Sequence, residues 1–113
     1  MKFNPGRLKE RVDIVRRKDR VNELSQRVQE FETIRSVYAD VVDIRGNKYY
    51  DAKKLVPEIT HFVYIRYTKA PVEQDMLIRH KGKMYEVKSC IDMQGQKIQY
   101  EIQCVEKVKK VAG

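Results

Sequence analysis

The chain lacks tryptophan and is poor in histidine, cysteine and proline: its 113 residues include two histidines, two cysteines and three prolines. Cys90 and Cys104 do not form a CxxC pair and have no regularly spaced histidine partners, which argues against a metal centre. Both lie in apolar segments, where a thiol is most often a small buried hydrophobe. We therefore expect no disulfide, no metal and no cofactor.

Long apolar runs and catalytic motifs are also missing. The apolar stretches are only a few residues long and no secretion signal opens the chain, so we expect no membrane span and no export. There is no GxSxG, phosphate-binding glycine loop, HExxH or EF-hand pattern. A joint role for His61 and His80 would need a third partner. The strand carboxylates fall where side chains normally face water: Asp40, Asp43, Glu86 and Glu101. We expect no catalytic residues and no enzyme.

What the chain does have is positive charge. It carries 24 basic and 16 acidic residues, a net charge of +8 and a pI near 9.5. Such a balance favours an acidic neighbour, which can be nucleic acid, an anionic membrane or an acidic protein face. Acidic residues punctuate the basic ones except in the opening segment and at residues 81–83 and 107–110. The length and the 42% hydrophobic content predict a single folded domain over residues 1–113.

Alternation of apolar and polar residues with a period of two marks most of the strands. The clearest is residues 58–67, where Val63 and Ile65 share one face and Phe62 and Tyr64 the other. Neither face is purely polar, so we expect the outer one to meet a neighbouring subunit. Turn residues at 4–6, 81–83 and 94–96 separate further segments. The other expected strands are residues 10–17, 33–44, 76–80, 84–91 and 97–105.

Two segments interrupt this pattern. In residues 18–32, Val21, Leu24, Val28 and Phe31 have the spacing of one helical face, and the alternative is a polar hairpin. After a break at residues 45–47, residues 48–55 predict a turn or two of helix before a proline. The fold class is therefore all-β: a small antiparallel β-barrel or sandwich of about six strands, with a long connection between the second and third long strands.

A basic barrel with tyrosines on its strands suggests one function. Tyr64, Tyr67, Tyr85 and Tyr100 would stack exposed bases, making the chain a monomeric small-barrel module that binds single-stranded nucleic acid. The alternative is that these tyrosines belong to the core and rim of the sheet, as strand aromatics usually do.

Several segments in order resemble the phage head–tail joining family, also called head closure or stopper proteins, of long-tailed phages. They are NPGRLKERVDIV, SVYADVVDIRGNKYYDAKKL, THFVYIRYTKAP and MLIRHKGKMYEVKSCIDM. Tyr38 stands where family members often have tryptophan. In the family, residues 18–32 correspond to a variable hairpin-like excursion, so we predict the hairpin there.

The resemblance implies a structural protein that forms a homo-oligomeric ring at the head–tail interface of the virion, after assembly in the host cytoplasm. The ring would lie below the portal and its adaptor, receive the tail completion protein, and hold packaged double-stranded DNA in its channel by non-specific contact. Residues 45–58 would point toward that channel. The expected DNA-facing residues are Arg45, Lys48, Lys53 and Lys54. The expected subunit-interface residues are Tyr49, Tyr50, Leu55, Phe62 and Tyr64.

Overall fold

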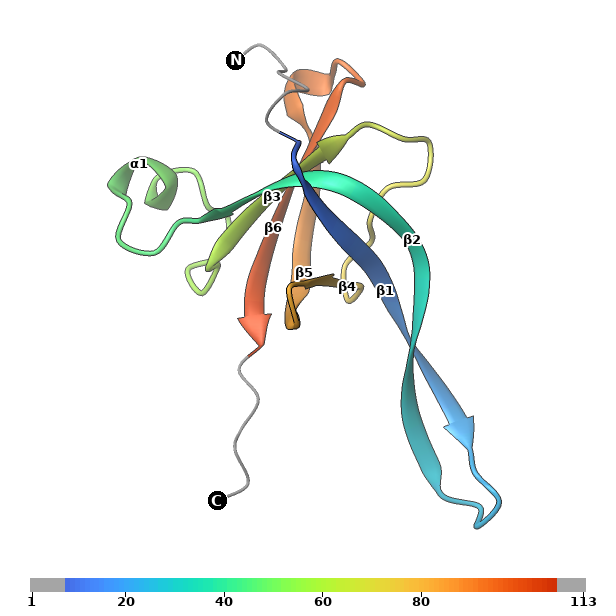
Figure 1. Cartoon of the computed structure of the whole chain (residues 1–113). Helices are drawn as coiled ribbons and strands as arrows, with labels where there is room; N and C mark the ends of the chain where they lie inside the picture. The colour runs from blue at the N-terminus through green and yellow to red at the C-terminus, as the bar shows by residue number, and fades with distance from the viewer. Residues whose placement is uncertain (1–7, 108–113) are drawn as a thin grey trace.

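Six antiparallel strands close into one barrel in the computed structural model of the chain, which describes residues 8–107 (Figure 1). Each strand is hydrogen-bonded to the next in the order β1-β2-β3-β6-β5-β4, and β4 returns to β1. The strands are β1 (Glu10–Val21), β2 (Arg27–Asp43), β3 (His61–Arg66), β4 (Leu77–His80), β5 (Lys83–Asp92) and β6 (Gln99–Lys107); the short helices are α1 (Lys48–Asp51) and η2 (Met93–Gly95). The all-β expectation is confirmed. The expected turn at residues 4–6 and residues 108–110 of the basic cluster lie outside the described residues.

The core fills the barrel with the inward side chains of every strand. β3 lies between β2 and β6, and its Val63 faces Val41 and Ile102 across the two ladders. The largest core cluster consists of Val12, Ile14, Ala39, Val63, Ile65, Val72, Ile78, Tyr85, Val87, Tyr100, Ile102 and Cys104. The alternation expected for the first strand places Val12 and Ile14 in this core correctly. Val15 is buried as well, because a bulge in the β1–β2 ladder follows Ile14.

β1 and β2 continue beyond the barrel as a long curved hairpin, the arm (residues 16–32), which Figure 1 shows leaving the barrel at the lower right. The ladder runs to the pair Val21 and Arg27, so the hairpin prediction is confirmed and the helical spacing misleads. Leu24 is 76% exposed in the turn, where helix packing would have buried it. The turn is fixed by Asn22, whose Oδ1 accepts the backbone N–H groups of Leu24 and Gln26.

The two remaining hairpins follow the expected turns. Lys81 and Gly82 both have positive φ, at 49° and 77°, which is the geometry of a two-residue type I′ turn between β4 and β5. Between β5 and β6, residues 93–98 lie outside the ladder, so the loop is longer than the three expected turn residues. Cys90 pairs with Ile102, while Cys104 pairs with Val87. Both cysteines are free.

Glu86 on β5 lies at the centre of an ion cluster on the outer surface of the barrel. Its carboxylate is 3.0 Å from Nζ of Lys88, 3.0 Å from Nζ of Lys107 and 3.6 Å from the Arg17 guanidinium on the arm. Hydrogen bonds from Lys107 and then Lys88 lower the pKa of Glu86 from 4.5 to about 2. The cluster ties the root of the arm to the last two strands.

The low pKa of Glu86 makes part of the stability of the barrel depend on pH. Because the pKa in the folded state lies below the ordinary value of 4.5, the stabilisation is present above that pH and is lost as the pH falls toward about 2. We expect the free energy of unfolding of wild type to exceed that of Glu86→Gln by more at about pH 7 than at about pH 3. Urea unfolding at both pH values measures this, and an equal difference at both would contradict the ion cluster.

No helix among residues 8–107 has the length and apolar character needed to cross a membrane.

Candidate functional site in the connection between β2 and β3

The connection between β2 and β3, residues 44–60, is the long link that the sequence predicts. It begins at Ile44, which is fully buried and donates its backbone N–H to the Thr60 carbonyl at 3.0 Å, so the two ends of the connection are joined. Gly46 turns the chain at a φ of 80°. Asn47 then caps α1, its side chain accepting the Tyr49 backbone N–H at 3.0 Å. The predicted short helix is confirmed.

An aromatic cluster holds the connection on the outer face of β3. The Tyr50 ring meets the Phe62 ring edge-on with centroids 5.4 Å apart, and Phe62 meets Tyr64 at 6.4 Å. Phe62 is fully buried and Tyr64 is 5% exposed, and Ile44 and Ile59 complete the cluster. The apolar outer face of β3 is therefore covered by the chain's own connection. This corrects the expectation that Phe62 and Tyr64 lie exposed for a neighbouring subunit.

Two polar side chains of β6 fasten the far end of the connection. Gln103 accepts the backbone N–H of Leu55 at 2.8 Å and donates to the Lys53 carbonyl at 3.3 Å and to Glu101 at 3.1 Å. Glu101 also accepts from the Tyr64 hydroxyl at 3.2 Å. Burial, with the Glu101 carboxylate nearby, raises the pKa of Tyr64 far above its ordinary value, so the hydroxyl stays protonated as a donor. Gln103 thus satisfies one backbone donor and one backbone acceptor of the connection.

This polar clamp, Glu101 and Gln103, was not expected from the sequence. Glu101 was expected to face water, yet it is 5% exposed and Gln103 is 1% exposed. Burying these groups is tolerated because each has hydrogen-bond partners and the Glu101 carboxylate lies 3.5 Å from Nζ of Lys53. One signal was available: residues 58–67 are apolar on both faces, which indicates that something covers the outer side of this part of the sheet.

The four predicted DNA-facing residues all lie on this connection, but most of their charge is balanced within the chain. Lys53 pairs with the buried Glu101, and Lys54 lies 3.3 Å from Asp51. Lys48 is exposed and forms no ion pair among the described residues. Residues 44–60 contain four basic and two acidic side chains, and Asp43 at the end of β2 adds a third carboxylate beside them, so little net charge remains.

Arg45 is bound most firmly of the four. Its guanidinium lies 2.7 Å from the Asp43 carboxylate and 3.4 Å from Glu106 on β6. The hydrogen bonds from the Arg45 side chain and backbone hold the pKa of Asp43 well below its ordinary value. Arg45 therefore anchors the start of the connection.

The exposed apolar side chains of the connection are the ones that a partner can reach. Tyr49 is 59% exposed and Leu55 is 65% exposed, whereas Tyr50 is partly buried against Phe62. Lys53 lies over the Tyr49 ring, with Nζ 5.5 Å from the ring centroid. Of the five predicted interface residues, the structure thus leaves Tyr49 and Leu55 open on the surface.

The single-strand-binding alternative loses its stacking surface. Tyr64, Tyr85 and Tyr100 are at most 5% exposed, and Tyr67 packs partly buried against the core. These tyrosines are core and rim residues, so no row of exposed rings lies on the sheet.

The histidines do not form a joint site. His80 pairs with Glu10 through Nε2 at 3.1 Å, while His61 is buried 3.9 Å from Asp43. Among the described residues, no group of three or more His, Cys, Asp and Glu side chains could hold a metal ion.

Comparisons with known proteins agree with this architecture. The solution structure of protein SF1141 from Shigella flexneri 2a matches with a TM-score of 0.68 at 21% identity, over 96% of this chain and 100% of that one, which supports the fold. No curated protein sequence gives a significant match. The sequence model of the family described as phage head completion protein matches residues 3–107, which confirms the resemblance drawn from the strand motifs. The chain therefore belongs to the phage head completion protein family, and its role is a structural one in the head–tail region of the virion.

Proposed function

We propose that the chain acts as one domain over residues 1–113 and forms a homo-oligomeric ring that completes the DNA-filled head. The ring lies below the portal and its adaptor, retains the packaged DNA, and offers the surface to which the tail completion protein attaches. Its subunits join the virion in the host cytoplasm. Family membership supports a place in the head–tail region of the virion, and the connection between β2 and β3 supports the way in which the ring retains DNA.

The observation that carries this proposal is a connection that is anchored at both ends and exposed between them. The Ile44–Thr60 hydrogen bond and the polar clamp fix its ends, while Tyr49 and Leu55 project from it. A preorganised segment binds with less loss of conformational entropy than a mobile one. In a ring, a heterologous contact repeats around the axis, so the connections of all subunits lie at equivalent places.

The geometry favours a connection that closes the channel by its bulk over one that attracts DNA by strong positive charge. The ion pairs of Arg45, Lys53 and Lys54 leave a small net charge on each connection. Weak, non-specific phosphate contact by Lys48 and its neighbours is multiplied by the copy number of the ring. Tyr49 and Leu55 supply bulk that meets the adjacent subunit or narrows the channel.

Complementation of DNA-filled heads that lack this protein tests the proposal. Purified wild type is added, or the double variant Tyr49→Ala/Leu55→Ser, and DNase-resistant DNA and tail joining are measured. We expect wild type to restore both, and the double variant to leave DNA retention near the level of heads given no protein. Lys48→Glu should weaken retention more at low salt than at high salt, because exposed charges are screened.

The matched control is Ile98→Ser, which removes another half-exposed apolar side chain outside the connection. It should retain DNA like wild type. Replacing Lys53 is a poorer test, because its loss leaves the buried Glu101 carboxylate without its cation. Normal DNA retention by the folded double variant would show that the connection does not close the channel.

A further inference from the structure

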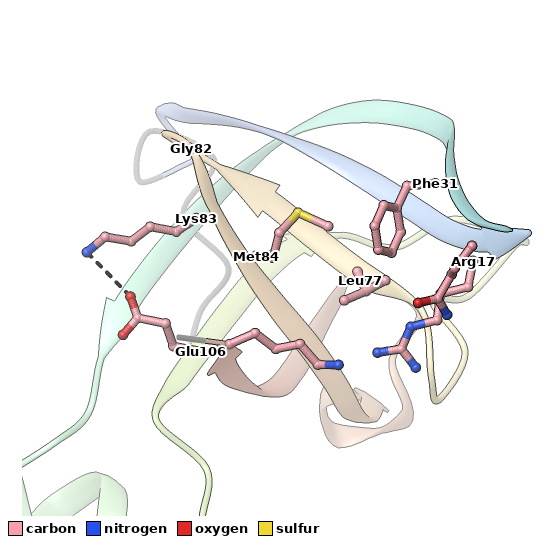
Figure 2. A pocket seen from close by; sticks show the side chains of 9 residues that line it. Arg17, Phe31, Leu77, Gly82, Lys83, Met84 and Glu106 are labelled. Carbon is pink, nitrogen blue, oxygen red and sulfur yellow. Dashed lines mark ion pairs between the residues drawn. The ribbon is translucent and has the colours of Figure 1, made fainter. Parts of the chain in front are cut away.

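A groove of about 660 Å³ lies on the other side of the barrel from α1, between the arm and the β4–β5 hairpin (Figure 2). It exists because the arm curves away from the barrel after the bulge at Ile14 and Val15 and overhangs the outer surface of β4 and β5. The residues that matter here are Arg17, Phe31, Leu77, Lys83, Met84 and Lys107.

The inside of the groove is apolar. Leu77 is 1% exposed and Met84 is partly buried, and together they form the floor. Phe31 on the arm is 51% exposed, and Figure 2 shows its ring lying beside Leu77 and Met84. A half-exposed aromatic side chain and a flexible methionine around a hollow suit the insertion of an apolar side chain from a partner.

The surroundings of the groove carry more basic than acidic side chains. Lys83 lies 3.4 Å from Glu106. Arg17, Lys88 and Lys107 share Glu86. Four cations around these two carboxylates leave a net positive rim, which complements a negatively charged partner.

Two other occupants fit less well. Among the described residues the most exposed large apolar side chain is Leu24, at the tip of the arm. It lies among three basic and two acidic residues at 18–27, so a second copy presents charge of the same sign. Duplex DNA matches the charge, but its phosphate backbone offers nothing to an apolar floor.

We propose that this groove is a docking site for an acidic protein segment that carries a bulky apolar side chain. The apolar side chain contacts Phe31, Leu77 and Met84, while acidic neighbours contact Lys83 at one end and Arg17 and Lys107 at the other. The partner is another protein chain, and the surface is separate from the connection assigned to DNA retention. The inference goes beyond the proposed function and does not depend on it.

Titration of the full-length ¹⁵N-labelled chain with a capped peptide of sequence EDLFDE tests the proposal. We expect the amide signals of Phe31, Met84 and Lys107 to shift in a saturable way. A peptide of sequence EDSSDE, with the same charge and no apolar anchor, should bind at least about tenfold more weakly. Phe31→Ala and Lys83→Glu should each weaken EDLFDE binding by about tenfold, while the matched charge reversal Lys69→Glu, outside the groove, should leave it within about twofold.

Four results would overturn the proposal. Equal binding of the two peptides, or no shift at the groove, would show that no apolar anchor is recognised. A stronger shift of the same signals by a duplex oligonucleotide, unaffected by Phe31→Ala, would identify a nucleic-acid surface. Groove signals that move with protein concentration in the absence of peptide would identify a contact between copies of the chain. The amide spectra of the variants also report directly whether each one is folded.

Discussion

Replacing Phe62 with alanine is expected to lower the free energy of unfolding by about 3–5 kcal/mol, the usual cost of removing a fully buried aromatic side chain. Phe62 is 0% exposed and contacts Tyr50 on α1 and Tyr64 on its own strand. The substitution leaves a cavity between β3 and the connection, so the connection loses its main apolar contact with the barrel. Urea unfolding measures the loss of stability, and hydrogen exchange of residues 44–60 should show faster opening than the barrel strands.

The matched control for this change is Phe31→Ala. Phe31 is 51% exposed on the arm, so the same truncation should lower the free energy of unfolding by less than about 1 kcal/mol. A loss at Phe62 no larger than the loss at Phe31 would contradict the claim that the aromatic cluster holds the connection on the barrel.

Gln103→Leu is expected to free the end of the connection while the barrel stays folded. The substitution keeps the size of the side chain but removes the bonds to Leu55 N–H and the Lys53 carbonyl, and it takes one donor from Glu101. Groups left without partners cost about 1–3 kcal/mol each where they are buried, so a loss of about 2–3 kcal/mol is expected. Hydrogen exchange at Leu55 should accelerate by the largest factor of any amide in the chain.

The control is Gln99→Leu, on the same strand but outside the polar clamp. It should change neither the free energy of unfolding nor hydrogen exchange at Leu55 appreciably. Heads given Gln103→Leu should also lose DNA faster than heads given Gln99→Leu, because a mobile connection binds its neighbours less tightly. If exchange at Leu55 is the same in the two variants, the clamp does not position the connection.

The strands were predictable because their side chains alternate locally. Residues 10–17, 33–44 and 58–67 carry that alternation, and Gly82 is the residue type that its φ of 77° in the turn favours. The secondary structure of the arm was ambiguous in the sequence. Its apolar side chains are largely exposed, so their spacing does not show the alternation of buried and exposed residues that marks a strand. Its hairpin depends on cross-strand pairs such as Arg16–Glu32 and Arg20–Glu30, which no periodicity in one strand reveals.

The long connection was predictable in position but not in detail, and its proposed role at the channel came from the family resemblance. The length of the link and its turn chemistry identify residues 45–58, yet the burial of Phe62, Tyr64 and Glu101 depends on the link folding back over β3 and β6. That contact joins residues that are far apart in the sequence. In the folded chain, Arg45, Lys53 and Lys54 are paired with carboxylates. The sequence alone therefore suggested more unpaired positive charge on the connection than the structure leaves there.

The central claim is that the connection between β2 and β3 is the part of each subunit that closes the channel. Electron cryomicroscopy of DNA-filled heads carrying this protein tests it most directly, because the barrel can be placed in the map and α1 located relative to the axis. The account predicts a ring with α1, Tyr49 and Leu55 of every subunit facing the channel below the DNA. Density that places α1 on the outer circumference, with the arm lining the channel, would contradict it.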